Sequence, residues 1–396
     1  MFHIILCAAD HGVAAENVSA FPQSITKTMV RNYLEYKGAA LNAFAAFINA
    51  PIIVADLGMT EKFFHNDLID LSVRRGTNNI SKGAAMTEGE ARLAVDNGRK
   101  LAKIAISKGA KYILPAEMGI ANTTSSAAMS SALLNLPPEK VTGRGTNISD
   151  EKLLHKINIV NQVVTINKID YNNPIEILAK LGGFELAAIT GIILEAAEHN
   201  VKIILDGLNS TVPALIASRI NSNVKNILVP SHLAGEAAHS YLLKELGLTP
   251  YFDLDFHLGE ACGSSIMAKC IEIKENGTEN LLLNNNCNVI HIQNTTSTQK
   301  KSLREAMQNK FLALSMPHHA LGALEEIAMI LAENLGTINI KENIPLNKNW
   351  LNSMGIFWEK YLINEKRLPH FAEVLTRASL YIFNRMKTFD EAKILG

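Results

Sequence analysis

The sequence predicts an α/β fold: a doubly wound, mostly parallel sheet of the Rossmann-like kind, with a smaller helical domain. The main observation is a series of short apolar runs that end in small or acidic residues or in proline. Most of these runs precede a longer stretch with helical spacing, and this alternation is typical of a parallel sheet covered on both faces. The predicted strands are Ile4–Ala9, Ile52–Asp56, Tyr112–Leu114, Ile203–Asp206 and Ile227–Pro230.

The length of 396 residues favours one large domain plus a smaller one. Residues 1–273 are expected to form the large α/β domain, in which Glu88–Ser107 carries the apolar stripe of a core-facing helix. Residues 274–301 are rich in Asn, Thr and Ser and predict a polar excursion or hairpin. Residues 302–396 are expected to form the small helical domain.

The composition excludes several function classes. Lysine plus arginine equals aspartate plus glutamate, at 38 each, so no basic surface for nucleic acid or an anionic membrane is expected. The four cysteines have no C-x-x-C spacing, so we expect reduced thiols and no metal site. The apolar N-terminus reads as a buried strand rather than a signal peptide, and no apolar run reaches the ~18 residues of a membrane helix. A cytoplasmic protein is expected.

Ligands of such folds bind beyond the carboxyl ends of the strands. That rule places four segments along the edge of the sheet where the strands end, called the rim below: Asp10-His11-Gly12, Asp56, Glu117 and Asp206-Gly207. The segment Glu117–Ser126 has hydroxyl side chains where a helix over 127–136 would begin, and a helix N-terminus suits a phosphate. Taken alone, the segment favours the alternative of an ordinary Thr/Ser N-cap.

Three further segments have chemical and structural interpretations. Gly143-Arg144-Gly145 followed by Lys156 suggests an anion site, or equally a solvent loop. Asp206–Thr211 fits a plain strand-to-helix turn. Glu260 is a carboxylate among small residues, and a raised pKa in such a setting suits a general base. Its local context alone favours a helix-capping Glu at the start of a helix over 264–271.

Together these segments resemble one family, the nicotinate-nucleotide:dimethylbenzimidazole phosphoribosyltransferases, often called CobT. The resemblance covers roughly residues 1–270. The matching stretches, in family order, are Ala9–Val13, Pro22–Thr26, Glu117–Thr124, Gly143–Thr146, Lys180–Glu185, Leu205–Gly207, Pro230–His232 and Leu258–Glu260.

The resemblance implies a dimer that transfers phosphoribose from nicotinate mononucleotide to an aromatic base and releases nicotinate. The pyridinium nitrogen of the donor leaves as a neutral ring nitrogen, so no metal, pyrophosphate or other cofactor is expected. The family's catalytic base falls on Glu260. Phosphate and ribose contacts fall on Glu117, Gly119, Asn122, Thr123, Gly145, Lys156 and Ser210. The acceptor pocket falls on Phe21, Met29, Met118 and Leu258.

The sequence departs from the family in ways that leave two hypotheses open. A family element usually found ahead of the first strand has its nearest match at 317–325, so that helix is expected to have moved toward the C-terminus. Some relatives place Ser and Gln where this chain has Phe21 and Met29, which favours an acceptor needing few hydrogen bonds, such as a phenol. Phenolic acceptors are handled in this family by paired, non-identical subunits. The chain is therefore either an active transferase, as a homodimer or heterodimer, or a non-catalytic structural subunit of a heterodimer.

Overall fold

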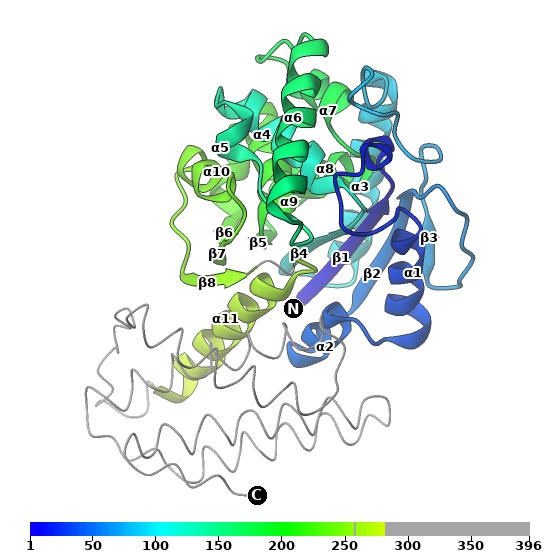
Figure 1. Ribbon diagram of the computed structural model, residues 1–396. Helices are drawn as coiled ribbons and strands as arrows, with labels where there is room; N and C mark the ends of the chain where they lie inside the picture. Colours follow the sequence, from blue (N-terminus) through cyan, green and yellow to red (C-terminus); the bar gives the residue numbers. More distant parts are fainter. Residues whose placement is uncertain (257–258, 282–396) are drawn as a thin grey trace, which may run out of the picture. The chain divides into compact units, whose positions relative to one another are not determined.

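A computed structural model of the protein describes residues 1–256 and 259–281 (Figure 1). The chain divides into one unit at Met1–Ile273 and a second at Lys274–Gly396. The account below concerns the first unit. The predicted helical domain at 302–396, the family element at 317–325 and residues 282–301 of the predicted excursion lie outside the described residues.

A six-stranded parallel sheet has the order β3-β2-β1-β4-β5-β6. Its strands are β1 (Phe2–Ala9), β2 (Ile52–Gly58), β3 (Leu68–Asp70), β4 (Tyr112–Met118), β5 (Lys202–Leu205) and β6 (Leu228–Pro230). A two-stranded parallel sheet pairs β7 (His232–Ala234) with β8 (Phe252–Phe256). The predicted doubly wound fold and its five strands are confirmed. Strands β3, β7 and β8 were not predicted, because three to five residues give too little apolar pattern to detect.

Helices connect these strands. The α-helices are α1 (Ile25–Arg31), α2 (Ala40–Phe47), α3 (Glu88–Ser107), α4 (Asn122–Leu134), α5 (Pro138–Val141), α6 (Asp150–Ile166), α7 (Pro174–Leu181), α8 (Phe184–Glu198), α9 (Leu208–Ile220), α10 (His239–Leu246) and α11 (Cys262–Leu281). Short turns of other types are η1 (Gly12–Glu16), η2 (Asn32–Tyr36) and η3 (Ser222–Ile227).

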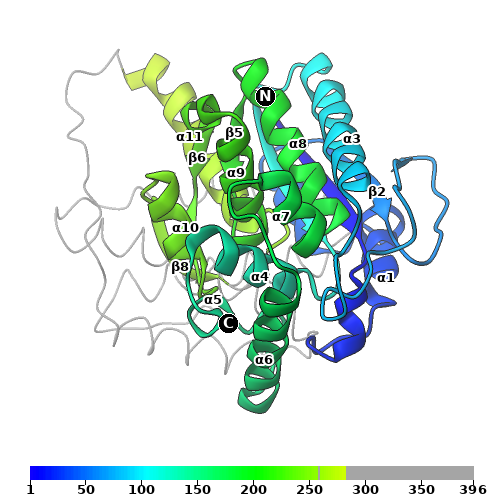
Figure 2. The same cartoon turned by 90° about the horizontal axis from the view of Figure 1, so that it is seen from above.

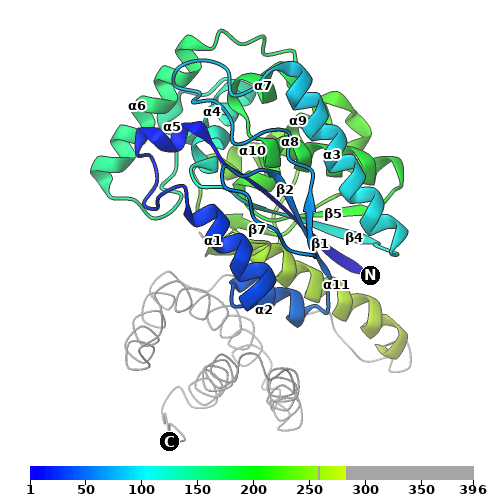
Figure 3. The same ribbon diagram turned by 90° about the vertical axis from the view of Figure 1, so that its right-hand side faces the viewer.

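Strand β1 is buried along its whole length, and its alternating side chains enter two different cores. Ile5, Cys7 and Ala9 pack with residues of α3, α4, α8 and α9 on one face of the sheet. Ile4, Leu6 and Ala8 pack with residues of α1, α2 and α11 on the other. Figure 3 shows these two layers on opposite sides of the strands. Burial on both faces explains why the strand reads as a continuous apolar run rather than an alternating one.

Helices α3 and α8 lie side by side on the first face, as Figure 2 also shows. Glycines allow their backbones to touch. A Cβ on Gly98 would lie 1.8 Å from the Ala188 carbonyl oxygen, and one on Gly191 would lie 1.8 Å from the Val95 carbonyl oxygen. The helix pair thus forms a rigid layer behind the central strands.

Helix α11 overturns part of the predicted excursion at 274–301. The helix continues through Leu281, so residues 274–281 are helical and not a polar loop or hairpin. Extending an existing helix adds one hydrogen bond per residue, which outweighs the poor propensity of Asn276 and Gly277 over so short a stretch. Composition alone could not reveal this extension.

Candidate active site

The strand order reverses between β1 and β4, and the site lies beyond the carboxyl ends of these strands. The register pairs Cys7 with Glu117 and Ala8 with Asp56, which brings the predicted rim residues to one edge of the sheet. Gly119 follows directly, and a Cβ there would lie 2.4 Å from the Ala9 carbonyl oxygen. Glycine therefore lets the loop after β4 fold tightly over the end of β1.

Glu117 is the second-last residue of β4 and is partly buried. One carboxylate oxygen accepts a hydrogen bond from the Asn122 side-chain amide, and the other accepts one from Asn209 at 3.1 Å. Burial raises the pKa of Glu117 to about 7, and repulsion from Glu185 and Glu260 adds to the rise. Glu117 therefore changes charge near neutral pH while held in place by two amides.

The buried side chain of His11 supports the end of β1 next to Glu117. The Nε2 atom of His11 lies 2.6 Å from Glu185 Oε1, and its Nδ1 atom lies 2.9 Å from Ser125 Oγ. A Cβ on Gly183 would lie 2.3 Å from the imidazole ring. Burial alone would lower the pKa of His11, but the Glu185 carboxylate raises it overall. The contacts tie the end of β1 to α4 and α8.

Helix α4 begins at Asn122, five residues before the predicted helix at 127–136. The N-cap residue is Ala121, which has a left-handed φ of 74° and makes no side-chain cap. The ordinary Thr/Ser N-cap is therefore wrong for this helix. Its first turn has no capping side chain, and its positive dipole end suits an anion.

Lys156 and Gly145 complete the expected phosphate site. Lys156 comes from α6, is 1% exposed, and donates hydrogen bonds to Thr123 Oγ1 at 2.9 Å and the Gly143 carbonyl at 3.0 Å. Burial lowers the pKa of this lysine to about 8, against the opposing charge of Glu236. Gly145 has a φ of 56°, and a Cβ there would lie 2.6 Å from Thr123 Oγ1. A side chain at 145 would therefore fill the space in front of the lysine.

Glu236 is a member of this site that the sequence analysis missed. It lies between β7 and α10, and its Oε1 atom accepts the Gly145 N–H at 2.9 Å. Its Oε2 atom is buried without a hydrogen-bond partner among the described residues. No spacing pattern marks this residue, because a Glu in a short loop normally faces solvent.

Glu260 precedes α11 and faces α2. Its Oε2 atom accepts the Leu41 N–H at 3.4 Å, and the Tyr33 hydroxyl approaches without reaching hydrogen-bond geometry. Burial raises the pKa of Glu260, and the hydroxyl and the N–H oppose this rise. The first turn of α11 is capped instead by Asp206, whose Oδ1 atom accepts the Ser264 N–H at 2.8 Å. The helix-capping interpretation of Glu260 is therefore wrong.

The remaining predicted residues have different surroundings. The Ser210 hydroxyl accepts the Asp206 N–H at 2.9 Å and donates to the Gly207 carbonyl at 3.0 Å, so it serves the turn before α9. Met29 and Met118 are partly buried against the core that also contains Ala261, next to Glu260. Phe21 is 52% exposed. Leu258 lies outside the described residues.

Several buried polar atoms around this edge have no hydrogen-bond partner among the described residues. They are Asn209 Oδ1, Glu236 Oε2, Thr124 Oγ1 and Ser264 Oγ. Buried polar groups are normally paired, so unpaired ones need an explanation. A ligand that carries hydroxyl groups would complement them, because its hydroxyls can donate to the carboxylate and amide oxygens and accept from the Thr124 and Ser264 hydroxyls.

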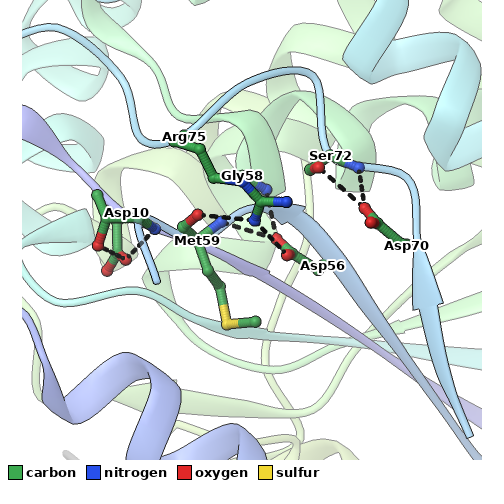
Figure 4. Close-up of polar contacts among 8 residues, drawn as sticks. Asp10, Asp56, Gly58, Met59, Asp70, Ser72 and Arg75 are labelled. Atoms are coloured by element: carbon green, nitrogen blue, oxygen red, sulfur yellow. Dashed lines mark hydrogen bonds and ion pairs between the residues drawn. The ribbon is translucent and has the colours of Figure 1, made fainter. Parts of the chain in front are cut away.

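At the other, braced end of the rim, the carboxylates of Asp56 and Asp70 are held by hydrogen bonds and an ion pair (Figure 4). Asp56 Oδ1 accepts the Gly58 and Met59 N–H groups at 2.8 and 2.7 Å, and its Oδ2 atom lies 2.9 Å from Arg75. Asp70 accepts the N–H and hydroxyl of Ser72 at 3.1 and 2.9 Å. In the part of the chain that the structure describes, no group of three or more His, Cys, Asp or Glu side chains could hold a metal ion. Nor is any helix there long and apolar enough to span a membrane.

Comparison with known proteins matches residues 2–276 to a family model described as phosphoribosyltransferase. The nicotinate-nucleotide–dimethylbenzimidazole phosphoribosyltransferase of Chlorobium chlorochromatii is 41% identical over 266 residues, which cover 67% of this chain and 75% of that protein. The enzyme of that name from Thermus thermophilus is 42% identical over 262 residues, covering 66% of this chain and 78% of the relative. The crystal structure of CobT from Thermus thermophilus superposes with a TM-score of 0.65 at 39% identity, covering 69% of this chain and 85% of that one.

Proposed function

Because the chain belongs to the family of nicotinate-nucleotide–dimethylbenzimidazole phosphoribosyltransferases, we propose that it transfers phosphoribose from nicotinate mononucleotide to an aromatic acceptor for cobamide synthesis, with Glu260 as general base. The observation that carries this proposal is the pairing of two carboxylates of raised pKa, Glu117 and Glu260, with an uncapped helix start and a buried lysine. A carboxylate of raised pKa is a competent base near neutral pH.

The donor nucleotide would bind by its phosphate at the start of α4. Lys156 would supply the cation and Thr123 a hydroxyl. Gly145 has no side chain, so the phosphate could approach its backbone closely. Glu117 and Asn122 would then face the ribose hydroxyls, since the two side chains are already held together. Gly119 packs on the end of β1 and would keep this loop in position.

The reaction needs one bond to form and one to break at C1′ of the ribose. A ring nitrogen of the acceptor attacks C1′, and the bond from C1′ to the nicotinate nitrogen breaks. That electron pair stays on the nicotinate ring, which leaves without a positive charge on its nitrogen. The acceptor's N–H proton passes to the Glu260 carboxylate, so charge and atoms balance without a metal or pyrophosphate.

The acceptor would lie beside Glu260 against Met29 and Met118. We include Phe21 and Leu258 in this pocket as predictions. None of these four side chains offers a strong hydrogen bond, which favours a flat, mostly apolar acceptor. Dimethylbenzimidazole fits this description, and a phenol, whose hydroxyl proton would pass to Glu260, is the second candidate.

Assaying the isolated chain tests this proposal. Purified chain is incubated with nicotinate mononucleotide and either dimethylbenzimidazole or phenol, and released nicotinate and the new nucleotide are separated by chromatography. We expect release with at least one acceptor and almost none with Glu260→Gln. Activity only after co-expression with a related chain would identify a heterodimer, and unchanged Glu260→Gln turnover in such a pair would assign this chain a structural role. No product under any of these conditions would refute the proposal.

A further inference from the structure

The backbone that carries Glu260 is strained. Gly259, Glu260 and Ala261 have φ values of 69°, 56° and 58°, so three consecutive residues lie in the left-handed region. Only glycine adopts this region freely, and Glu260 and Ala261 incur a steric penalty there. Such strain persists only where neighbouring structure fixes it, and it concentrates at functional sites.

Asp206 is the anchor that holds this turn to the sheet. It follows β5, is 6% exposed, and accepts the Ser264 N–H with its Oδ1 atom at 2.8 Å. Its own N–H donates to Ser210 Oγ at 2.9 Å, which fixes Asp206 in turn. The carboxylate thus connects the end of β5 to the first turn of α11, shortly beyond Glu260.

Close packing of the start of α11 against β7 restricts the same turn further. A Cβ on Gly263 would lie 2.0 Å from Nδ1 of His232, so the first turn of α11 lies directly against β7. With Asp206 on one side of Ser264 and His232 against Gly263, the helix start has little room to shift. The left-handed turn before it is held by the same contacts.

The Asp206 carboxylate also acts on the charge of Glu260. Burial raises the pKa of Glu260, and repulsion from Asp206 raises it further. The other groups that face Glu260 from the described elements are Tyr33 of η2, the Leu41 N–H of α2 and Glu117 of β4. Among the described residues, no lysine or arginine forms an ion pair with Glu260 that would offset the repulsion.

We infer that Asp206 is a positioning residue for Glu260: its hydrogen bond to Ser264 holds the left-handed turn that carries Glu260, and its own negative charge lies near the Glu260 carboxylate. The inference rests on the proposed role of Glu260 as general base. A plain strand-to-helix turn would not explain why a buried carboxylate at position 206 contacts the start of α11, whereas a positioning role does.

The test is Asp206→Asn. Asparagine keeps the oxygen that accepts the Ser264 N–H but loses the negative charge. Protein labelled with ¹³C in its glutamate carboxyl groups is titrated by NMR, and the Glu260 signal is assigned by its loss in Glu260→Gln. We expect the Glu260 midpoint to move to lower pH in Asp206→Asn and the plateau kcat to fall about two- to tenfold, because a weaker base accelerates proton transfer less.

A matched control and a second variant complete the design. Asp70→Asn removes a rim carboxylate from the same sheet and should leave the Glu260 midpoint unchanged. Asp206→Ser, which is neutral and can also accept a hydrogen bond, replaces Asp206→Asn if that variant does not fold. A folded, neutral variant with an unchanged or higher Glu260 midpoint overturns the inference. A shifted midpoint in a chain that transfers no phosphoribose refutes the proposed function but leaves the interaction between Asp206 and Glu260 supported.

Discussion

Two groups of acidic residues lie at the carboxyl ends of the same parallel sheet, and they have opposite surroundings. Asp56 near the end of β2 has two backbone donors and Arg75, and Asp70 at the end of β3 has Ser72 (Figure 4). Glu117 near the end of β4 has two neutral amides as hydrogen-bond donors, and Glu260 has one long hydrogen bond and no cation among the described residues. Position on the rim therefore does not decide how far a carboxylate is compensated by its neighbours.

The two groups differ in the interactions that offset the cost of burying a charged carboxylate. Burial raises the pKa of Asp56 overall as well, but three hydrogen bonds and the Arg75 charge limit the rise. At Glu117 and Glu260 the neighbouring charges are mostly carboxylates, so repulsion adds to burial. Hydrogen bonds and Arg75 thus hold Asp56 in place before the loop after β2, whereas the surroundings of Glu117 and Glu260 fit the substrate-binding and proton-transfer roles proposed for them.

The largest effect expected from this contrast is on Glu260. Glu260→Gln should lower kcat about 10²- to 10⁴-fold, because the amide cannot take the acceptor's proton. Asp56→Asn, at the braced end of the rim, should keep kcat within about threefold. Steady-state rates of both purified variants, with circular dichroism as the folding control, measure the comparison. Equal losses in the two variants would remove the distinction between the two groups.

The next effect is on nucleotide affinity. Lys156→Met should raise the Kd for nicotinate mononucleotide about 10- to 100-fold, the cost of one charged hydrogen bond. Because the pKa of Lys156 is about 8, wild-type affinity should also fall as the pH rises past that value. Calorimetric titration at pH 7 and pH 9 measures both effects. Lys152→Met, an exposed lysine one turn earlier on α6, should change neither result.

A smaller effect, and one of opposite sign, is expected on stability at Glu117. The folded protein holds this carboxyl with a pKa near 7, above its unfolded value, so ionisation destabilises the fold as the pH rises from about 4.5 to 7. Glu117→Gln should therefore be about 1–3 kcal/mol more stable than wild type at pH 8 and equal to it near pH 4.5. Urea unfolding at both pH values measures this difference. A variant that is less stable at pH 8 would show that ionised Glu117 is compensated after all.

The smallest effect is expected at the braced end. Arg75→Met should cost about 1 kcal/mol of unfolding free energy, because Arg75 is partly exposed while Asp56 is buried, and it should leave kcat unchanged. Thermal unfolding and a rate measurement on the same sample provide the test. A loss of activity without a loss of stability would assign the loop after β2 to the active site.

The sequence predicts the sheet well because its central strands are buried on both faces and leave long apolar runs. It predicts the rim positions of Asp56, Glu117 and Asp206 for the same reason, since each follows such a run. It does not predict their partners. Arg75, Asn209 and Glu236 reach their contacts from loops or from other elements, and no local spacing encodes those approaches.

At Glu260, local sequence predicts the wrong role. Local sequence favours a helix cap, and only the resemblance to a family singles this residue out as a base. The capping bond belongs to Asp206, far earlier in the chain, and forms because β5 ends beside the start of α11. The short strands β7 and β8 and the early start of α4 were missed because their stability comes from tertiary packing rather than propensity.

The most direct test of the account follows the nucleotide by ³¹P NMR under single-turnover conditions. Chain in excess over nicotinate mononucleotide, with saturating dimethylbenzimidazole, should replace the donor's phosphate resonance with that of a new riboside phosphate. Glu260→Gln should bind the donor and leave its resonance intact. Conversion by Glu260→Gln at the wild-type rate would contradict the assignment of Glu260 as the base in the unbraced half of the rim.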